Sequence, residues 1–425
     1  MKKLIFLLVV LTAFGFQSAY AQDVVDEHQP LKVKPTVALH GRVQYDYEFL
    51  NQDSGVDSVD DLKLRGNEFR RVYLSGSGKI YKNIKYKVQF EFAGSQIGYR
   101  DVYIKFVNLP GIGGNFTVGS FAEATGLDML TSSNYIPMLE RALMTSTQNF
   151  RWNSGLMYDN MGMFGGKLGL QMSYAGNGSH HGGFKDKHLE NGGHFVARLT
   201  SPVYENKEKH QLVHIGVNFE SRKRSKDPAA YSLKLRAEDH LGDYIHIPGE
   251  EFIDIPGLLK NQQDIGFEFA ANFGSFSFQS EYEIAGYNAV VKDGSVDKDQ
   301  TFNLNGFYAL VSYFVTGGQR GFKHGAFARP HIYNNFCIKD GNWGELELVA
   351  RYSTLDYSSI TDYLDLFSGK DYYSKTADIG FGFNWYLNNH TRLMYNHIIT
   401  STNRNTDVDK EKNLNADLIR LQVDF

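Results

Sequence analysis

The chain has a single cysteine, only nine prolines and no long apolar run in its mature part. The lone Cys337 excludes an internal disulfide, so stability has to come from other interactions. After Ala21 no stretch approaches the ~18 consecutive apolar residues of a helical span. Together with a mean hydropathy of -0.37, this excludes a helical membrane protein. The 44 basic residues are outnumbered by 48 acidic ones, which argues against a nucleic-acid partner.

The amino terminus predicts export. Lys2 and Lys3 precede an apolar stretch that ends at Phe16, and Ala19-Tyr20-Ala21 forms a small-residue cleavage site. A membrane anchor is the alternative, but this stretch is shorter than the ~20 residues that a spanning helix needs. We therefore expect a signal peptide over residues 1–21, a short N-terminal extension over 22–35 and one domain over 36–425. No Pro- or Ser-rich linker divides that domain.

Aromatic residues make up 14% of the chain and there are 42 glycines, which favours many strands joined by turns. The clearest strand pattern lies between residues 84 and 92. One face would carry Ile84, Tyr86, Val88, Phe90 and Phe92, and the other would carry Lys85, Lys87, Gln89 and Glu91. This is the two-residue period of a strand with one apolar and one wet face.

The same alternation recurs along the chain in 16 or 17 segments, and a bacterial single-chain barrel should have an even number of strands. We therefore predict an all-β transmembrane antiparallel barrel of about 16 strands, in the cell outer membrane and in contact with its lipid. The segments 151–158 and 231–236 are the least certain strands. A secreted sandwich, propeller or solenoid is the alternative. Alternation over nine to twelve residues exceeds the ~5–6 of an average sandwich strand, which favours the barrel.

The carboxyl terminus has the same two faces. Ile419, Leu421, Val423 and Phe425 alternate with Leu418, Arg420, Gln422 and Asp424. A terminal strand that ends on an aromatic residue resembles the signal that outer-membrane barrels present to their assembly machinery. We expect that machinery to be a partner through Phe425.

The connections differ in length. Short turns at Lys82-Asn83 and around Gly274 are expected on the periplasmic side, and long polar loops over 51–66, 175–193, 222–265 and 323–343 on the other. The connection from Glu123 to Phe150 is long and partly apolar, with charges at Glu140 and Arg141. Such a segment favours the lumen over water, which predicts an inward-folded constriction loop.

Several segments, in this order, resemble the phosphate-selective porin O and P family. They are Phe69-Arg-Arg-Val-Tyr-Leu-Ser-Gly-Ser-Gly-Lys-Ile-Tyr-Lys82, Tyr86-Lys-Val-Gln-Phe90, Asp101-Val-Tyr-Ile104, Thr131-Ser-Ser133, Met138-Leu-Glu-Arg141, Tyr313-Phe-Val-Thr-Gly-Gly-Gln-Arg320, Glu345-Leu-Glu-Leu-Val-Ala-Arg-Tyr-Ser353, Gly382-Phe-Asn-Trp-Tyr-Leu387 and Arg420-Leu-Gln-Val-Asp-Phe425. The resemblance implies a 16-stranded porin, usually a homotrimer, with anion-conducting members that bind phosphate through inward Arg and Lys side chains.

The inferred inner face mixes both signs of charge. The pore-lining and constriction candidates are Lys85, Lys87, Glu91, Asp101, Lys105, Glu140, Arg141 and Arg351. A filter that passes anions needs an unopposed positive field, so this mixture predicts a weakly selective diffusion channel for small hydrophilic solutes or ions. A phosphate- or anion-selective porin is one alternative. A barrel that acts mainly as a binding partner or surface receptor is the other.

We expect no enzymatic activity and no cofactor. The chain has no Gly-x-Ser-x-Gly, no His-Glu-x-x-His and no P-loop. His180, His181, His188 and His194 in a Gly-rich loop could bind zinc or copper if the loop brought them together. A solvated extracellular loop without a metal is the interpretation we favour.

Overall fold

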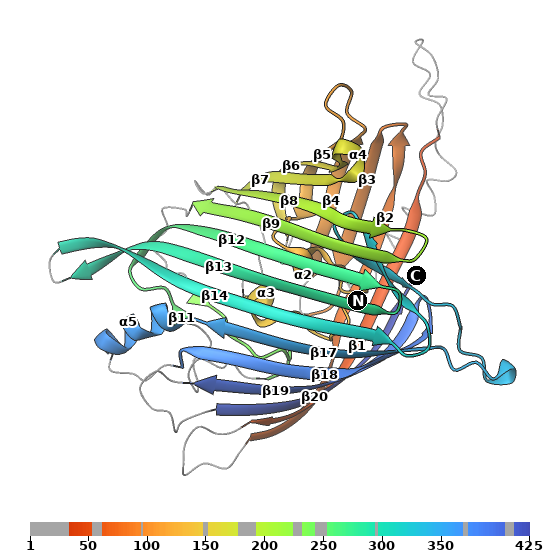
Figure 1. The fold of residues 1–425 in the computed structure, drawn as a ribbon. Coiled ribbons are helices and arrows are strands. Elements are labelled where there is room, and N and C mark those ends of the chain that lie inside the picture. Colours follow the sequence, from red (N-terminus) through yellow and green to blue (C-terminus); the bar gives the residue numbers. More distant parts are fainter. Residues whose placement is uncertain are drawn as a thin grey trace, which may run out of the picture.

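Sixteen antiparallel strands, each paired with its neighbour along the chain, form a ring that closes where β1 pairs with β20 (Figure 1). The computed structural model describes residues 34–52, 62–94, 97–147, 152–176, 193–223, 232–242, 253–293, 296–368, 373–403 and 412–425. The expected signal peptide and most of the N-terminal extension lie outside these residues. Within the described part of the chain, no helix is long and apolar enough to cross a membrane.

The wall consists of β1 (Ala38–Gln52), β2 (Leu62–Tyr81), β3 (Ile84–Glu91), β4 (Gly98–Val107), β5 (Asn115–Ala122), β6 (Trp152–Gly162), β7 (Leu168–Gly176), β8 (Gly193–Asn206), β9 (Gln211–Lys223), β12 (Leu258–Phe273), β13 (Phe276–Asp293), β14 (Val296–Phe314), β17 (Glu345–Asp356), β18 (Lys375–Asn388), β19 (Thr391–Asn403) and β20 (Lys412–Asp424). The connections contain α2 (Leu127–Leu130), α3 (Leu143–Thr147), α4 (Met163–Gly166), β10 (Ser232–Leu233), β11 (Ile253–Asp254), β15 (Gln319–Lys323), β16 (Ala326–His331), η1 (Ile338–Asp340) and α5 (Ser358–Ser368).

The two faces of the wall reverse the usual distribution of a water-soluble protein. Large apolar side chains lie exposed on the outside, as at Phe267, which is 49% exposed, and Ile379, at 53%. Polar side chains such as Gln44, Arg198 and Asn396 are buried on the inside. An apolar outer band around a polar interior is what a bilayer requires of a barrel. The predicted fold, with its two-residue alternation, is confirmed.

The last residue closes the barrel against the first strand. The backbone N–H of Gly41 donates to the carbonyl oxygen of Phe425 (2.9 Å), and the N–H of Phe425 donates back to Gly41 (3.0 Å). A Cβ on Gly41 would lie 2.1 Å from the Phe425 ring, so glycine at this position lets the ring lie against the first strand as it does here. Both ends of the described chain therefore meet on one side of the barrel, where Figure 1 marks N and C.

The tight turns at Lys82-Asn83 and around Gly274 lie on the same side as these ends, as predicted. The prediction for 323–343 is wrong. Phe314 ends β14 beside the Gly274 turn, so the connection from Val315 to Gly344 lies on the side of the tight turns. Polar turn residues such as His324-Gly325 resemble those of an extracellular loop, which explains the error.

Of the two uncertain strands, one belongs to the wall. Trp152–Gly162 forms β6, while Arg151 lies outside the described residues. The second prediction, 231–236, is wrong as a wall strand, because Ser232 and Leu233 pair only with Asp254 and Ile253 in a small ribbon. Leu233 and Ile253 are buried in an apolar cluster inside the barrel, so their hydrophobicity reflects packing in the lumen.

Val88 and Lys87 provide a direct test of the two faces. The Lys87 side chain donates to Asp101 inside the barrel. Val88 is the next residue of the strand, so its side chain points to the outside. Val88→Arg should cost about 2–4 kcal/mol near the midplane and strongly reduce assembly, whereas Lys87→Ala should leave a folded barrel. Heat-modified electrophoretic mobility after reconstitution separates the two results. Equal assembly of both variants would contradict the face assignment.

Candidate functional site

The connection after β5 folds into the barrel, as predicted for Glu123 to Phe150. The structure describes it to Thr147, and Figure 1 shows α2 and α3 within the ring of strands. Its side chains Met138, Leu139 and Leu143 are completely or almost completely buried. They belong to an apolar cluster with inner-wall residues of β13, β14, β17, β19 and β20. Removal of this apolar surface from water holds the segment inside the lumen.

The wall also holds this segment by polar contacts. The carboxylate of Glu281 on β13 accepts the backbone N–H groups of Leu127 (2.5 Å) and Asp128 (2.8 Å). These groups begin α2 and would otherwise lack acceptors. Asn396 accepts from the N–H of Leu139 (2.7 Å), which fixes the segment at a second point, on β19. The segment is therefore attached to both halves of the ring.

Glu140 carries the strongest attachment. Arg70 donates to both of its carboxylate oxygens (2.8 and 2.9 Å), Arg420 donates at 2.9 Å, and Arg71 lies at 3.7 Å. Burial alone would raise the pKa of the Glu140 carboxyl, but these guanidinium groups hold that pKa well below its usual range. Arg420 also forms a bidentate pair with Asp46 (2.5 and 2.7 Å), so the three cations face two anions.

A β-bulge turns two consecutive arginines inward. Gln44 pairs with Arg71 and Tyr45 pairs with Phe69, so Arg70 is an extra residue in β2. Strict alternation would point either Arg70 or Arg71 toward lipid, which is costly. The extra residue lets both reach Glu140. The sequence signal for this bulge is the pair of consecutive charges inside an otherwise alternating strand.

Arg141 and Arg351 also form hydrogen bonds and ion pairs with neighbouring groups. Arg141 lies 3.5 Å from Asp128 and donates to the carbonyl of Thr131 (2.7 Å); burial lowers its pKa, partly offset by Asp128. Arg351 donates through Nε to Glu238 (2.8 Å) and through Nη2 to the carbonyl of Glu140 (3.0 Å). Both side chains are buried, so they fasten the inward segments and expose little charge to a passing solute.

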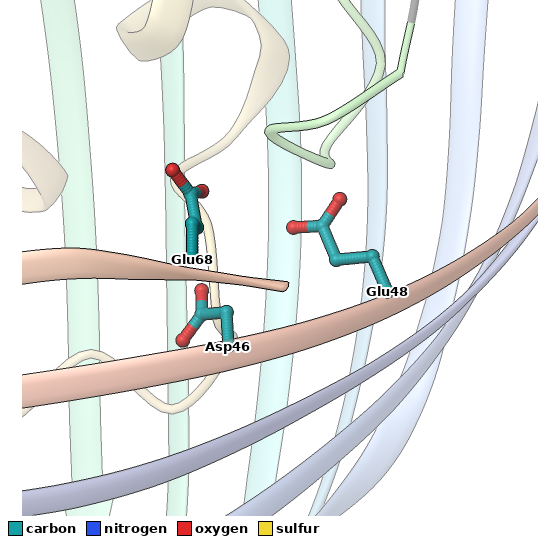
Figure 2. A group of neighbouring side chains, drawn as sticks. All are labelled: Asp46, Glu48 and Glu68. Carbon is teal, nitrogen blue, oxygen red and sulfur yellow. The ribbon is translucent and has the colours of Figure 1, made fainter. Parts of the chain in front are cut away.

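A second inward segment, residues 232–242, lies beside a group of carboxylates. Asp46 and Glu48 on β1 and Glu68 on β2 bring ligand oxygens within 4.8 Å of one another (Figure 2). Glu48 accepts from the backbone N–H groups of Leu241 (2.9 Å) and His240 (3.3 Å), and the His240 ring contacts Glu68. With Asp46 bound to Arg420, all three carboxylates have protein partners, and we assign them no metal ion.

A third inward segment enters from the side of the chain ends. The hairpin of β15 and β16 is held at its tip by Arg198, which donates to the carbonyl of Gly325 (2.6 Å). Arg320 donates to Gln279 on β13 (2.9 Å) and lies 3.5 Å from the centroid of the Phe327 ring. Phe327 packs in turn against Leu127 of the first segment. The two segments therefore meet inside the barrel.

An open cavity of about 690 Å³ remains on the side of the chain ends. Its charged lining consists of Arg42, Lys79, Lys85, Lys87, Lys105, Arg329 and Asp424. We call it the vestibule. Lys87 pairs with Asp101 and Lys105 with Asp159, each at 2.6 Å. Within the part of the chain that the structure describes, Lys79 and Lys85 have no carboxylate partner. The vestibule thus keeps a local excess of positive charge.

The opposite wall is acidic. In the ring of strands β13 lies eight positions from β3, so the two face each other. Glu268 stands directly opposite Glu281 on the neighbouring strand, and Asp264 stands opposite Glu220. Arg198 pairs with Glu268 at 2.7 Å, which offsets part of this repulsion. Carboxylates therefore gather on this wall, where Arg198 pairs with Glu268 and Arg222 pairs with Glu220.

The predicted site residues are thus all on the inner side. Lys85, Lys87 and Lys105 line the vestibule, Asp101 pairs with Lys87, and Glu91 accepts from Arg100 (3.2 Å). Glu140, Arg141 and Arg351 lie together where the first segment meets the wall. Their influence on conduction stays a prediction. Five arginines on the inner side were not predicted as site residues: Arg42, Arg70, Arg71, Arg329 and Arg420.

The histidine prediction is largely untested. His180, His181 and His188 lie outside the described residues. His194 is buried, with Nε2 at 2.9 Å from the carbonyl oxygen of Gly176 and Nδ1 at 3.0 Å from the Glu123 carboxylate. Nε2 thus has a hydrogen-bond acceptor, whereas Nδ1 lies close to Glu123 without forming a hydrogen bond, and this histidine stands beside the start of the first inward segment.

Comparisons with known proteins point in one direction. The profile described as phosphate-selective porin O and P matches residues 37–425. Porin O of Pseudomonas aeruginosa is 23% identical over 407 residues, which cover 91% of this chain and 88% of that protein. Two solved structures share the fold at 12% identity. The outer membrane channel DcaP of Acinetobacter baumannii has a TM-score of 0.54 and covers 93% of this chain and 98% of its own. OmpT of Vibrio cholerae, in its trimer form, has a TM-score of 0.50 and covers 92% and 100%.

Proposed function

The chain belongs to the phosphate-selective porin O and P family and is an outer-membrane channel; from that premise we propose that it conducts small hydrophilic solutes and ions with weak selectivity. The route would pass from the extracellular side around the three inward segments and leave through the vestibule. Transport of this kind needs no cofactor and no catalytic group. We therefore propose no enzymatic role for the barrel.

The observation that supports weak selectivity is the pairing of charges along the lumen. Lys87 and Lys105 each contact a carboxylate at 2.6 Å, and the arginines around Glu140 face Glu140 and Asp46. Opposite charges in contact leave only a weak dipolar field, and salt screens that remaining field within a Debye length of ~8–10 Å. A solute therefore meets no long stretch of uncompensated charge of one sign, which a strongly selective filter would need.

Anion selectivity is the second candidate, and one observation favours it. Lys79 and Lys85 stand across from each other in the pairing of β2 and β3, and Lys85 also stands across from Lys105. Arg42 adds a fourth cation, held by hydrogen bonds to Ser133 and Ser132. Organised positive charge at one mouth raises the local concentration of anions. We expect this to give a modest anion preference.

Lys85→Glu tests the vestibule. The change reverses one charge beside Lys79 and Lys105, so the anion-to-cation permeability ratio should fall by at least about twofold. Reversal potentials under a potassium chloride gradient measure it, with Lys339→Glu, outside the lumen, as the matched control. A ratio unchanged by Lys85→Glu would rule out the vestibule as the source of ion preference. Block of chloride current by added phosphate in the unmodified protein would instead favour a phosphate-selective porin.

Three partners remain proposals. The apolar outer face would contact outer-membrane lipid, and the terminal strand that ends at Phe425 would be presented to the barrel assembly machinery. A homotrimer is supported by the family resemblance and by the trimer form of the related fold of OmpT. Chemical crosslinking in native membranes tests the trimer.

A further inference from the structure

The periplasmic connection that supplies the β15–β16 hairpin also forms a second structure, outside the barrel. After Ile332, which is buried against Phe314 and Tyr386, the chain passes over the rim and forms a short hairpin around η1. We call residues 333–343 the arm. Figure 1 shows the arm and η1 projecting away from the ends of the strands, on the side where N and C lie.

The base of the arm is fastened to the outer face of the wall. The N–H of Phe336 donates to the carbonyl of Leu387 (2.7 Å), and the indole Nε1 of Trp385 donates to the carbonyl of Trp343 (2.6 Å). The Phe336 ring packs edge-on against Trp385, with 5.4 Å between ring centroids, and also against Trp343, at 6.2 Å. The three rings thus form one outward aromatic cluster.

The arm carries two large apolar side chains that are mostly exposed. Ile338 is 76% exposed and Trp343 is 71% exposed, although the hairpin that carries them is well defined by two hydrogen bonds between Cys337 and Asn342. Large exposed apolar groups on a fixed scaffold indicate a binding surface. Lys339, Asp340 and Asn342 lie between them and are exposed too. An aromatic side chain such as that of Trp343, with exposed polar groups beside it, is suited to the boundary between water and hydrocarbon.

This surface continues the lipid-facing band. On β18 the outward residues Ile379 and Phe381 are exposed, and Phe383 and Trp385 follow on the same face toward the periplasmic end. Trp385 therefore lies where an aromatic girdle is expected at the edge of the bilayer. Through Phe336 and Trp343 the girdle extends beyond the wall onto the arm. We propose that the arm binds the periplasmic headgroup layer of the outer membrane, with Trp343 and Ile338 inserted among the lipids.

A second copy of the chain is the alternative occupant of this surface. Fluorescence quenching of Trp343 distinguishes contact with lipid from contact with protein. The chain has three tryptophans, and Trp152 lies inside the barrel bound to Asp101. A Trp152→Phe/Trp385→Phe variant leaves Trp343 as the sole tryptophan, whose fluorescence is excited selectively above the absorption of tyrosine, and Phe at 385 retains a ring to pack against Phe336. The variant is reconstituted into phosphatidylcholine vesicles in which bromine is placed either near the headgroup end or near the methyl end of the acyl chains.

Bromine near the headgroups should quench Trp343 at least about twofold more than bromine near the chain ends, because tryptophan prefers the interface. Aqueous acrylamide should quench it weakly. Two control variants each keep one other tryptophan. Brominated lipid should quench the fluorescence of the variant that keeps only Trp385, and it should not quench that of the variant that keeps only Trp152. Strong acrylamide quenching without an effect of bromine would place the arm in water, and protection from both quenchers would place it against protein. Either result overturns the proposal.

Discussion

Glu140→Gln is expected to release the first inward segment from the wall of the barrel. Among the described residues, the substitution leaves Asp46, which contacts Arg420, as the remaining carboxylate paired with any of Arg70, Arg71 and Arg420, in a place where the Glu140 side chain is only 8% exposed. Removing one partner of such a buried pair costs about 3–5 kcal/mol. A loss of about 3 kcal/mol makes local opening about a hundredfold more frequent.

Trypsin provides the readout, because the bond after Arg141 is protected while that residue is buried at 4% exposure. Cleavage there should accelerate by about two orders of magnitude in the variant. Glu205→Gln is the matched control, since Glu205 lies 3.9 Å from Lys207 at the surface, where an ion pair contributes ~0–1 kcal/mol. Equal cleavage rates in Glu140→Gln and the unmodified protein would show that the carboxylate does not hold the segment.

The low pKa of Glu140 also sets the sign of the pH dependence. An unfolded glutamate titrates near ~4.3, and the folded group titrates well below that. Its stabilisation is fully present above the unfolded pKa and is lost only as pH falls through the folded pKa. Protection of the Ala142 amide from hydrogen exchange should therefore persist at about pH 4, after correction for the intrinsic rate. Loss of protection near pH 5 would mean that another group controls the segment.

Deletion of residues 130–145 is expected to raise single-channel conductance by at least about twofold, because it removes most of the protein mass that the first segment places in the lumen. The β15–β16 hairpin stays in place through Arg198 and Arg320, so the increase should be smaller than complete clearing of the barrel would give. Planar bilayer recordings of refolded protein measure the conductance. Heat-modified electrophoretic mobility verifies that the barrel has folded.

The control deletion removes residues 338–341 at the tip of the arm, which lie outside the lumen and should leave conductance unchanged. Both deletions shorten a connection, but only the first removes residues from the lumen. An increase in conductance that appears only in the first deletion is therefore due to loss of the constriction. Unaltered conductance after removal of residues 130–145 would refute a narrowing role for this segment.

The wall of the barrel could be predicted from the sequence because each strand obeys one local rule. Alternation in Ile84–Glu91 and in Lys412–Asp424 follows from lipid on one side and polar lumen on the other, and both strands have this arrangement. The inward course of the connection after β5 could also be predicted, because apolar residues such as Met138 and Leu139 have no place in an extracellular loop. These inferences need no knowledge of distant contacts.

The remaining details depend on contacts between residues far apart in the chain. Arg70-Arg71 breaks the alternation, and only the position of Glu140 explains why β2 accepts a bulge there. The hairpin around His324-Gly325 has the composition of an external loop, and its place in the lumen depends on Arg198, more than a hundred residues away. Leu235, buried inside the barrel, has the hydrophobicity of a wall residue without its pairing. Local pattern cannot distinguish these cases.

The most direct test of the account is the current through the unmodified protein in a planar bilayer under a potassium chloride gradient. The account predicts small, discrete conductance steps and a reversal potential displaced modestly toward the anion side. A barrel that gives no steps would be a binding partner or surface receptor in place of a channel. A reversal potential near the pure-anion limit would contradict the weak selectivity inferred from the paired charges of the lumen.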